Sequence, residues 1–322
     1  MENAESNFIP TRDLGDVQQA DNLLTASQLV EKAHEELKTK LNREVHVPKP
    51  PSLLLETQRV ADGEGFKFFE PIYFPKLSYR RLSDEHVIAW EGWIDWLAFN
   101  GPFAVKGFKS GSSNFPNPST FGGFWALFDK TPRPNFNEGK QLFDNDEQLG
   151  SIIAERITSR QENLSHVPKT SRFGISLNDV CSFVFTDLSR RLRLEDKVKM
   201  RLENRVKKDA VAFIRTPKLM EFNFAGNTRY PFLGKADTWE WLYDTLDARN
   251  FLICGSSDPY NLIKEGVRLQ RQQIGPFIST GLAAYSIAEP ESSFDKVAFR
   301  PVIVFGKDHF ELSPTGYRRL RQ

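Results

Sequence analysis

The residues with the most evident chemical potential form a basic run at positions 190–209, RRLRLEDKVKMRLENRVKKD. Nine lysine and arginine side chains stand there against four carboxylates, an excess of five positive charges. Arginine matches phosphate with two parallel hydrogen bonds, so this run predicts contacts with nucleic-acid phosphates, RNA being the first candidate. The residues expected to make these contacts are Arg190, Arg191, Arg193, Lys197, Arg201, Arg205, Lys207 and Lys208. A solvated helix face and an acidic segment of another copy are the alternative explanations of the same charges.

The sequence contains no complete catalytic or metal-binding motif. Residues 144–155 place acidic side chains like a calcium loop, but position six of that loop requires glycine and is Leu149 here. Residues 101–110 approach a phosphate-binding loop, with glycine spacings that are one residue too long. The five histidines are scattered and the two cysteines lie far apart. We therefore expect no catalytic residue, no metal ion and no cofactor.

Aromatic side chains are abundant: the chain has 27 Phe and 6 Trp, against 3 Met. Buried rings contribute large contact areas, and several of these rings lie in segments rich in glycine, proline and serine. Without reactive side chains beside them, we interpret this surplus as contact surface between copies of the chain. The residues expected at such an interface are Leu29, Leu37, Trp90, Trp93, Phe115 and Phe121.

The N-terminal 50 residues predict an arm, a helix and a linker. Residues 1–25 are polar and acidic, and Thr25 or Ser27 could cap a helix with an apolar side chain at every fourth position. Prolines at 48, 50 and 51 end that helix. We expect residues 1–50 to be a flexible acidic arm, amphipathic helix and proline linker, and 51–322 to be a helical body. That body could consist of two packed subdomains, about 51–172 and 173–322.

The remaining periodicities predict a mainly helical fold with a few short strands and long irregular loops rich in aromatic residues and proline. We expect helices at 83–100, 145–162, 176–209, 237–249 and 258–273, extended structure at 66–82 and 218–224, a buried strand near 296–306, and an irregular segment at 101–137. Ser176 is expected to cap the helix that contains the basic run.

The overall charge and the N-terminal composition suggest the class of protein. The formal net charge is +1, which keeps repulsion between copies small. Neither a signal peptide nor a long apolar stretch is recognisable, so we expect a cytoplasmic protein, or a virion protein if the source is viral, with no membrane partner. The sequence favours a non-enzymatic, self-assembling coat or nucleocapsid protein. An intracellular enzyme and a nucleic-acid-binding regulatory protein are the alternatives.

Overall fold

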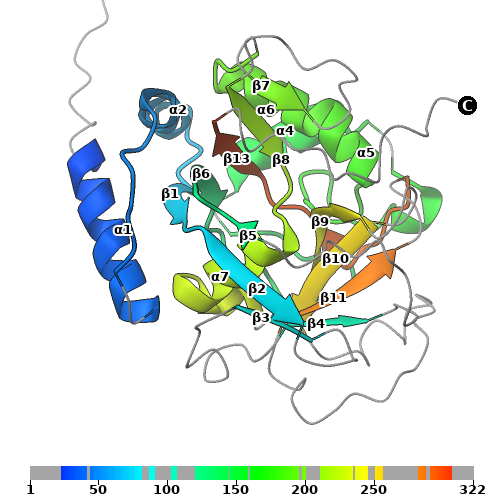
Figure 1. Cartoon of the computed structure of the whole chain (residues 1–322). Coiled ribbons are helices and arrows are strands. Elements are labelled where there is room, and N and C mark those ends of the chain that lie inside the picture. Colours follow the sequence, from blue (N-terminus) through cyan, green and yellow to red (C-terminus); the bar gives the residue numbers. More distant parts are fainter. Residues whose placement is uncertain are drawn as a thin grey trace, which may run out of the picture.

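Two β-sheets, with helices packed around them, organise the chain in the computed structural model (Figure 1). The structure describes residues 23–41, 44–81, 87–90, 103–106, 120–144, 146–158, 160–195, 198–200, 211–234, 236–245, 251–256, 282–287 and 291–306. The fold is mixed α/β, so the expectation of a mainly helical fold was wrong. The reason is that many strands are buried on both faces, and a run that is apolar on both faces has no period from which a strand can be recognised.

The first sheet has five strands and contains the centre of the main hydrophobic core. Its order is β1 (Phe69–Phe74), β6 (Phe124–Asp129), β13 (Val302–Phe305), β8 (Ala212–Arg215) and β7 (Val198–Met200). The first four strands pair antiparallel with one another, and β7 joins β8 in parallel. Every residue of β6, β8 and β13 is buried, which explains why the hydrophobicity of these strands does not alternate.

The second sheet has eight strands. Its order is β12 (Val297–Ala298), β9 (Trp239–Thr245), β10 (Phe251–Ser256), β11 (Leu282–Ile287), β4 (Phe103–Lys106), β3 (Val87–Trp90), β2 (Leu77–Arg81) and β5 (Thr120–Phe121). The pairs β12–β9 and β11–β4 are parallel, and the other neighbours are antiparallel. Three short connections join the two sheets along the chain, because β1 leads to β2, β5 leads to β6 and β12 leads to β13.

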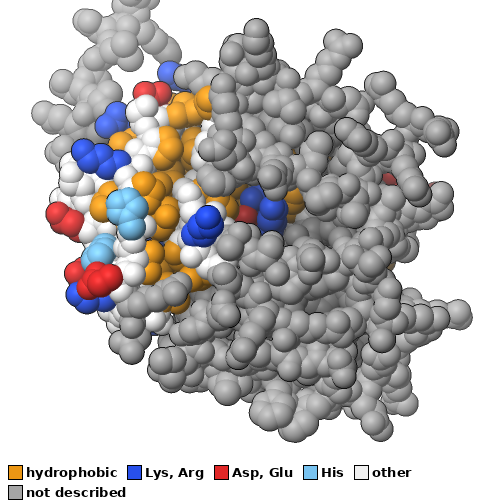
Figure 2. All heavy atoms as spheres, in the orientation of Figure 1, with side chains coloured by type: hydrophobic (Ala, Val, Ile, Leu, Met, Phe, Trp, Pro, Cys, Tyr) orange, Lys and Arg blue, Asp and Glu red, His pale blue; other side chains and the backbone are white. Residues whose placement is uncertain are grey.

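Helices α1 (Ala26–Leu41) and α2 (Ser52–Gly63) lie beside β1 at one side of the molecule (Figure 1). Thr25 caps α1 as expected, because Thr25 and Gln28 each accept a hydrogen bond from the other's backbone N–H. The predicted stripe on α1 is buried in the main core. Figure 2 shows this face of the molecule, where side chains of both charge signs are interspersed over α1 and α2.

Helices α4 (Glu147–Arg156), α5 (Leu177–Asp179) and α6 (Phe185–Arg191) group together near β7 and β8 (Figure 1). A π-helical turn at Val180–Val184 joins α5 to α6, so α5, this turn and α6 form one continuous helical segment. Ser176 caps it as predicted, accepting the backbone N–H of Asp179 at 3.1 Å. Helix α7 (Leu219–Thr228) and the 3₁₀ turns Glu162–Leu164 and Pro231–Gly234 complete the described helices.

Five predicted elements were wrong in type or in extent. The helix expected at 176–209 ends at Arg191 and is followed by β7, the one expected at 83–100 contains β3, and the one expected at 237–249 contains β9. The segment 218–224, expected to be extended, begins α7, because the carboxylate of Glu221 accepts the backbone N–H of Lys218 at 2.8 Å. The irregular segment 101–137 contains β4, β5 and β6. The helix expected at 258–273 lies outside the described residues.

The described aromatic side chains pack chiefly against one another inside this chain. Examples are the stacked pair Phe128–Tyr230 and the tilted pair Tyr73–Trp125. Leu29 and Leu37, which we expected at an interface between copies, are 4% and 2% exposed within the chain. Trp90 belongs to β3 and Phe121 to β5, but their side chains are not described, and Trp93 and Phe115 lie outside the described residues.

Candidate nucleic-acid interface

Three arginines converge on Asp187, a buried carboxylate in the first turn of α6. The carboxylate of Asp187 accepts hydrogen bonds from Arg156 and Arg190, each at 2.5 Å, and from Arg191 at 3.1 Å. Arg191 also pairs with Glu155 on α4, at 2.9 Å. Together with Arg193, which follows the helix, these three arginines form what we call the arginine corner: Arg156, Arg190, Arg191 and Arg193.

The carboxylate at the centre of the arginine corner is buried, whereas arginines around it are partly exposed to solvent. The Asp187 side chain is only 5% exposed, whereas those of Arg190 and Arg156 are 53% and 42% exposed. Burial acts to raise the pKa of Asp187, but the hydrogen bonds from Arg156 and Arg191 outweigh it and hold that pKa below its ordinary value. Asp187 therefore stays ionised at neutral pH and fixes the guanidinium groups around it. A guanidinium group carries five N–H donors, and donors of this kind bind phosphates and carboxylates.

The turn that follows α6 places Arg193 in an unfavourable backbone conformation. The N–H of Leu194 bonds to the carbonyl of Ser189 and that of Arg193 to the carbonyl of Arg190, both within 2.9 Å, which is the pattern of a Schellman motif. Such a motif needs a left-handed residue, usually glycine, and here Arg193 has a φ of 57°. Leu194 inserts into the core behind it and is 1% exposed. An exposed arginine in this left-handed conformation lowers the stability of the fold relative to glycine. Strained residues of this kind recur at functional sites.

Replacing Arg193 with glycine should therefore stabilise the protein. We expect the free energy of unfolding to rise by about 0.5–1 kcal/mol. Glycine removes the left-handed strain, but its greater conformational freedom stabilises the unfolded state and makes the increase smaller. Urea unfolding of the wild type and Arg193→Gly measures the difference. Arg193→Ala is the matched control, since it removes the charge and keeps the strain, and it should not stabilise. Equal stabilisation by both variants would contradict the backbone argument.

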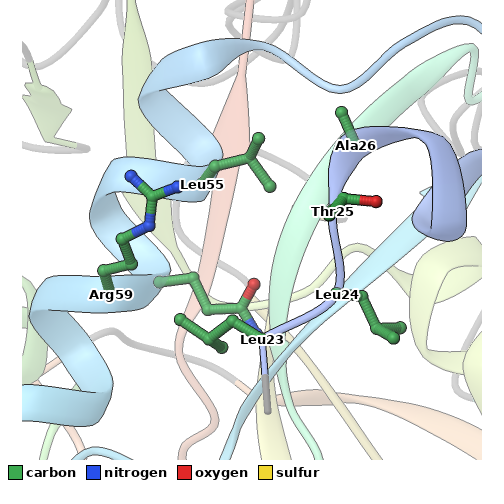
Figure 3. A pocket seen from close by; sticks show the side chains of 7 residues that line it. Leu23, Leu24, Thr25, Ala26, Leu55 and Arg59 are labelled. Atoms are coloured by element: carbon green, nitrogen blue, oxygen red, sulfur yellow. The ribbon is translucent and has the colours of Figure 1, made fainter. Parts of the chain in front are cut away.

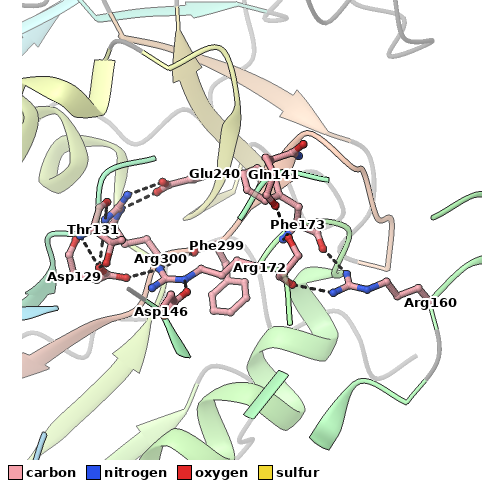
Figure 4. Close-up of polar contacts among 11 residues, drawn as sticks. Asp129, Thr131, Gln141, Asp146, Arg160, Arg172, Phe173, Glu240, Phe299 and Arg300 are labelled. Atoms are coloured by element: carbon pink, nitrogen blue, oxygen red, sulfur yellow. Dashed lines mark hydrogen bonds and ion pairs between the residues drawn. The ribbon is translucent and has the colours of Figure 1, made fainter. Parts of the chain in front are cut away.

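A second group of charged side chains is enclosed in the interior (Figure 4). Arg172 bonds to Asp129 and Asp146, and Arg300 makes a bidentate pair with Glu240 at 2.7 and 2.9 Å. These side chains are 0% exposed, apart from Asp146 at 7%. Arg172 ties the segment before α5 to the end of β6 and to the residue before α4, and Arg300 ties the turn between β12 and β13 to β9. Because its carboxylates face arginines of the same chain, we assign this network to the fold rather than to a ligand.

Burial and nearby charges have opposite effects on the pKa values of Arg172 and Asp146, and burial alone shifts that of Arg160 nearby. Burial opposes the charge on Arg172, but Asp129 and Asp146 outweigh it and raise its pKa. Arg160 donates to backbone carbonyls, including those of Phe173 and Ser171, and burial lowers its pKa to about 10. Asp146, which suggested a calcium loop, is thus engaged by Arg172, and burial raises its pKa. Among the described residues, no group of three or more His, Cys, Asp or Glu side chains could hold a metal ion.

A cavity of about 230 Å³ lies between the start of α1 and α2 (Figure 3). Its lining is Leu23, Leu24, Thr25, Ala26, Leu55, Gln58 and Arg59. The volume is smaller than that of sites for drug-sized ligands, and Arg59 supplies the only charged side chain of the lining. No cluster of titratable groups faces this cavity, so we place no chemistry there.

The structure brings together part of the predicted basic surface. Arg190, Arg191 and Arg193 lie in one corner, while Lys197, Arg201, Arg205, Lys207 and Lys208 lie outside the described residues. Arg156, Glu155 and Asp187 were not predicted from the sequence. A signal existed for Asp187, because Arg190 and Arg191 follow it at the three- and four-residue spacings of helical ion pairs. Arg156 reaches the corner from α4, 31 residues away, and no sequence spacing reveals that contact.

The sequence matches no protein-family model, and the comparisons with curated proteins and with solved structures found no match either. Within the described part of the chain, no helix is both long and apolar enough to cross a membrane.

Proposed function

We propose that this chain is a non-enzymatic protein that binds nucleic-acid phosphates without reading sequence and assembles with copies of itself, in the manner of a coat or nucleocapsid protein. The observation that carries the proposal is the arginine corner. Four arginines against the two carboxylates of Asp187 and Glu155 leave two positive charges at a partly exposed surface. A diester phosphate offers the planar pairs of oxygens that half-engaged guanidinium groups bind best.

The fixed positions of these guanidinium groups favour binding over solvation. Asp187 holds Arg156, Arg190 and Arg191 in place, so little side-chain entropy remains to be lost when a ligand binds. Contacts of this kind position a protein on the phosphate backbone and carry no base information. Affinity supplied in this way falls steeply with added salt and is the same for unrelated sequences.

Self-assembly is supported by the charge distribution over the whole sequence. The net charge of +1 lets copies crowd together with little repulsion. Residues 1–22 carry five acidic side chains and one basic one, whereas the segment 190–209 has the opposite sign. Opposite charges on two segments of the same chain favour contacts between neighbouring copies. Phosphate binding would then neutralise the remaining basic surface.

Removing two exposed arginines of the corner should weaken RNA binding and its dependence on salt. In Arg190→Ala/Arg193→Gly, Asp187 keeps Arg156 and Arg191, so the fold is retained. We expect the slope of log affinity against log salt concentration to become shallower by about 1.4, since each contact with a single strand contributes about 0.7. Fluorescence anisotropy with labelled 12-nucleotide RNAs of two unrelated sequences measures this slope.

The matched control is Lys49→Ala/Lys67→Ala, which removes the same charge from the exposed segments that flank α2. It should leave the slope unchanged. Light scattering of the same mixtures reports assembly, and the wild type should form larger particles with RNA than the arginine variant. A slope that is the same for wild type and arginine variant would refute the proposal. An affinity that depends strongly on RNA sequence would favour the regulatory alternative instead.

A further inference from the structure

The helical segment that carries the arginine corner also exposes an aromatic ring. Phe183 is 47% exposed, while its neighbours Val184 and Phe185 are completely buried. Of the described residues, the exposed large hydrophobic side chains are Leu24, Leu142 and Phe183, so Phe183 is the aromatic one among them. It lies in the π-helical turn Val180–Val184, and such turns shift the side chains that follow and recur at functional sites.

Phe183 and Arg190 are both exposed side chains of one continuous helical segment. They are seven residues apart, which in a regular α-helix is close to two turns and about 10 Å along the axis, so this spacing favours one side of the segment for both. Asp187, which anchors the arginines, lies between them at four residues from Phe183. We call Phe183, Arg190 and Arg193 the ridge. Along the chain it presents a ring, then the guanidinium group of Arg190, and finally Arg193 after the helix end. An exposed ring alone would indicate no ligand, but a ring aligned with fixed arginines does.

We propose that this ridge binds single-stranded nucleic acid, with Phe183 stacking on an unpaired base while Arg190 and Arg193 contact phosphates of the adjoining nucleotides. The proposal rests on the function proposed above and narrows its ligand. Proteins that bind single strands without sequence preference combine a basic track with aromatic side chains, because every base has a stacking face. A duplex offers its phosphates to the arginines but keeps its bases stacked inside, away from Phe183.

The π turn gives this arrangement a structural cause. Cys181 and Val184 within the turn are buried and hold it against the core, while Ser182 and Phe183 are exposed. The hydroxyl of Thr186 donates to the carbonyl of Ser182 at 2.8 Å, which satisfies one of the backbone acceptors of the turn. The ring is thus held outward by a fixed backbone. Because the backbone of the turn is already ordered, only the side chain of Phe183 has entropy to lose when a base stacks on it.

The test compares single-stranded and double-stranded RNA of equal length. Fluorescence anisotropy of the full chain is measured with labelled 12-nucleotide oligouridine and with the same strand in a duplex with oligoadenosine. The variants are Phe183→Leu, which keeps an apolar side chain without the ring, and Phe183→Trp, which keeps a ring. We expect Phe183→Leu to bind the single strand about tenfold more weakly, with duplex affinity unchanged. Phe183→Trp should bind the single strand at least as tightly as the wild type.

The arms of this experiment separate the two proposals. If Arg190→Ala/Arg193→Gly weakens binding of both RNAs while Phe183→Leu weakens neither, stacking is excluded and phosphate binding stands. If Phe183→Leu weakens both RNAs equally, Phe183 acts as general contact surface and the single-strand proposal fails. If the wild type binds polyglutamate and neither RNA, both proposals fail. Thermal unfolding of each variant verifies that a lost affinity is not a lost fold.

Discussion

Replacing Arg172 with methionine should lower the free energy of unfolding by about 3–5 kcal/mol, because it leaves two buried carboxylates without their shared cation. Arg172 is bonded to Asp129 and Asp146, and its guanidinium carbon lies 4.4 Å from the ring centre of Phe143. Methionine keeps an apolar stem of similar length, so the packing changes less than the charge does. Urea unfolding at pH 7 measures the loss.

The pH dependence of the Arg172 variant distinguishes the lost charge from lost packing. Burial already raises the pKa of Asp146 in the wild type, although Arg172 opposes this effect. Without Arg172 that pKa rises further, so the penalty is present above the folded-state pKa and is relieved as the pH falls through it. The destabilisation should therefore be smaller at pH 5 than at pH 7. Lys169→Met, on the exposed surface nearby, is the control and should change stability by less than about 0.5 kcal/mol. A deficit of Arg172→Met that is equal at both pH values would contradict the electrostatic explanation.

Replacing Glu221 with leucine should cost a similar 3–5 kcal/mol, and most of it should return when Arg215 is also replaced by methionine. The two side chains form a bidentate ion pair at 2.6 and 2.7 Å, and each is 1% exposed. The single variant leaves a buried guanidinium without its carboxylate, whereas the double variant removes both charges. The double variant should still lose about 1 kcal/mol, because Glu221 also accepts the backbone N–H of Lys218 at the start of α7.

A double-mutant cycle on this pair, measured by urea unfolding, isolates the interaction. Burial alone would raise the pKa of Glu221, but the nearby charge and hydrogen bonds of Arg215 outweigh it and lower that pKa. A depressed carboxylate pKa contributes stability that is complete above the unfolded-state value and is lost as the pH falls through the folded-state value. The wild type should thus lose more stability on acidification than the double variant does. Additive single effects in the cycle would show that the pair does not act as a unit.

The predictions from sequence held where local signals and the tertiary fold agree. Helix α1 has a capping residue, an apolar stripe of one face and prolines behind it, and all three signals are local. The extended structure of β1 and β13 was recognised because proline punctuation and β-branched runs exclude helix there. The cap at Ser176 was recognised because its signal is also local: Ser176 lies three residues before Asp179, whose backbone N–H it accepts. Beyond that cap, the prediction of one long helix through 176–209 was wrong.

The errors occurred where both faces of an element are buried. In β9, Trp239, Glu240 and Trp241 are each 0% exposed, so the polarity of the sequence does not follow the direction of the side chains. Glu240 is tolerated in such a strand only because Arg300, 60 residues later in the chain, supplies its partner. The arginine corner also depends on a partner that is remote in sequence, because Asp187 accepts a hydrogen bond from Arg156 on α4.

By itself the sequence determined the chemical character of this protein: abundant rings, balanced overall charge, and a local surplus of arginine at 190–193. It also determined the helices whose caps and stripes lie within a few neighbouring residues. Only the tertiary structure decided that the described rings pack mainly within one chain and that the interior arginines are neutralised by distant carboxylates. It also decided which arginines of this surplus stay partly exposed. The physical reason is that burial and ion pairing depend on partners that are remote in sequence, which no local period encodes.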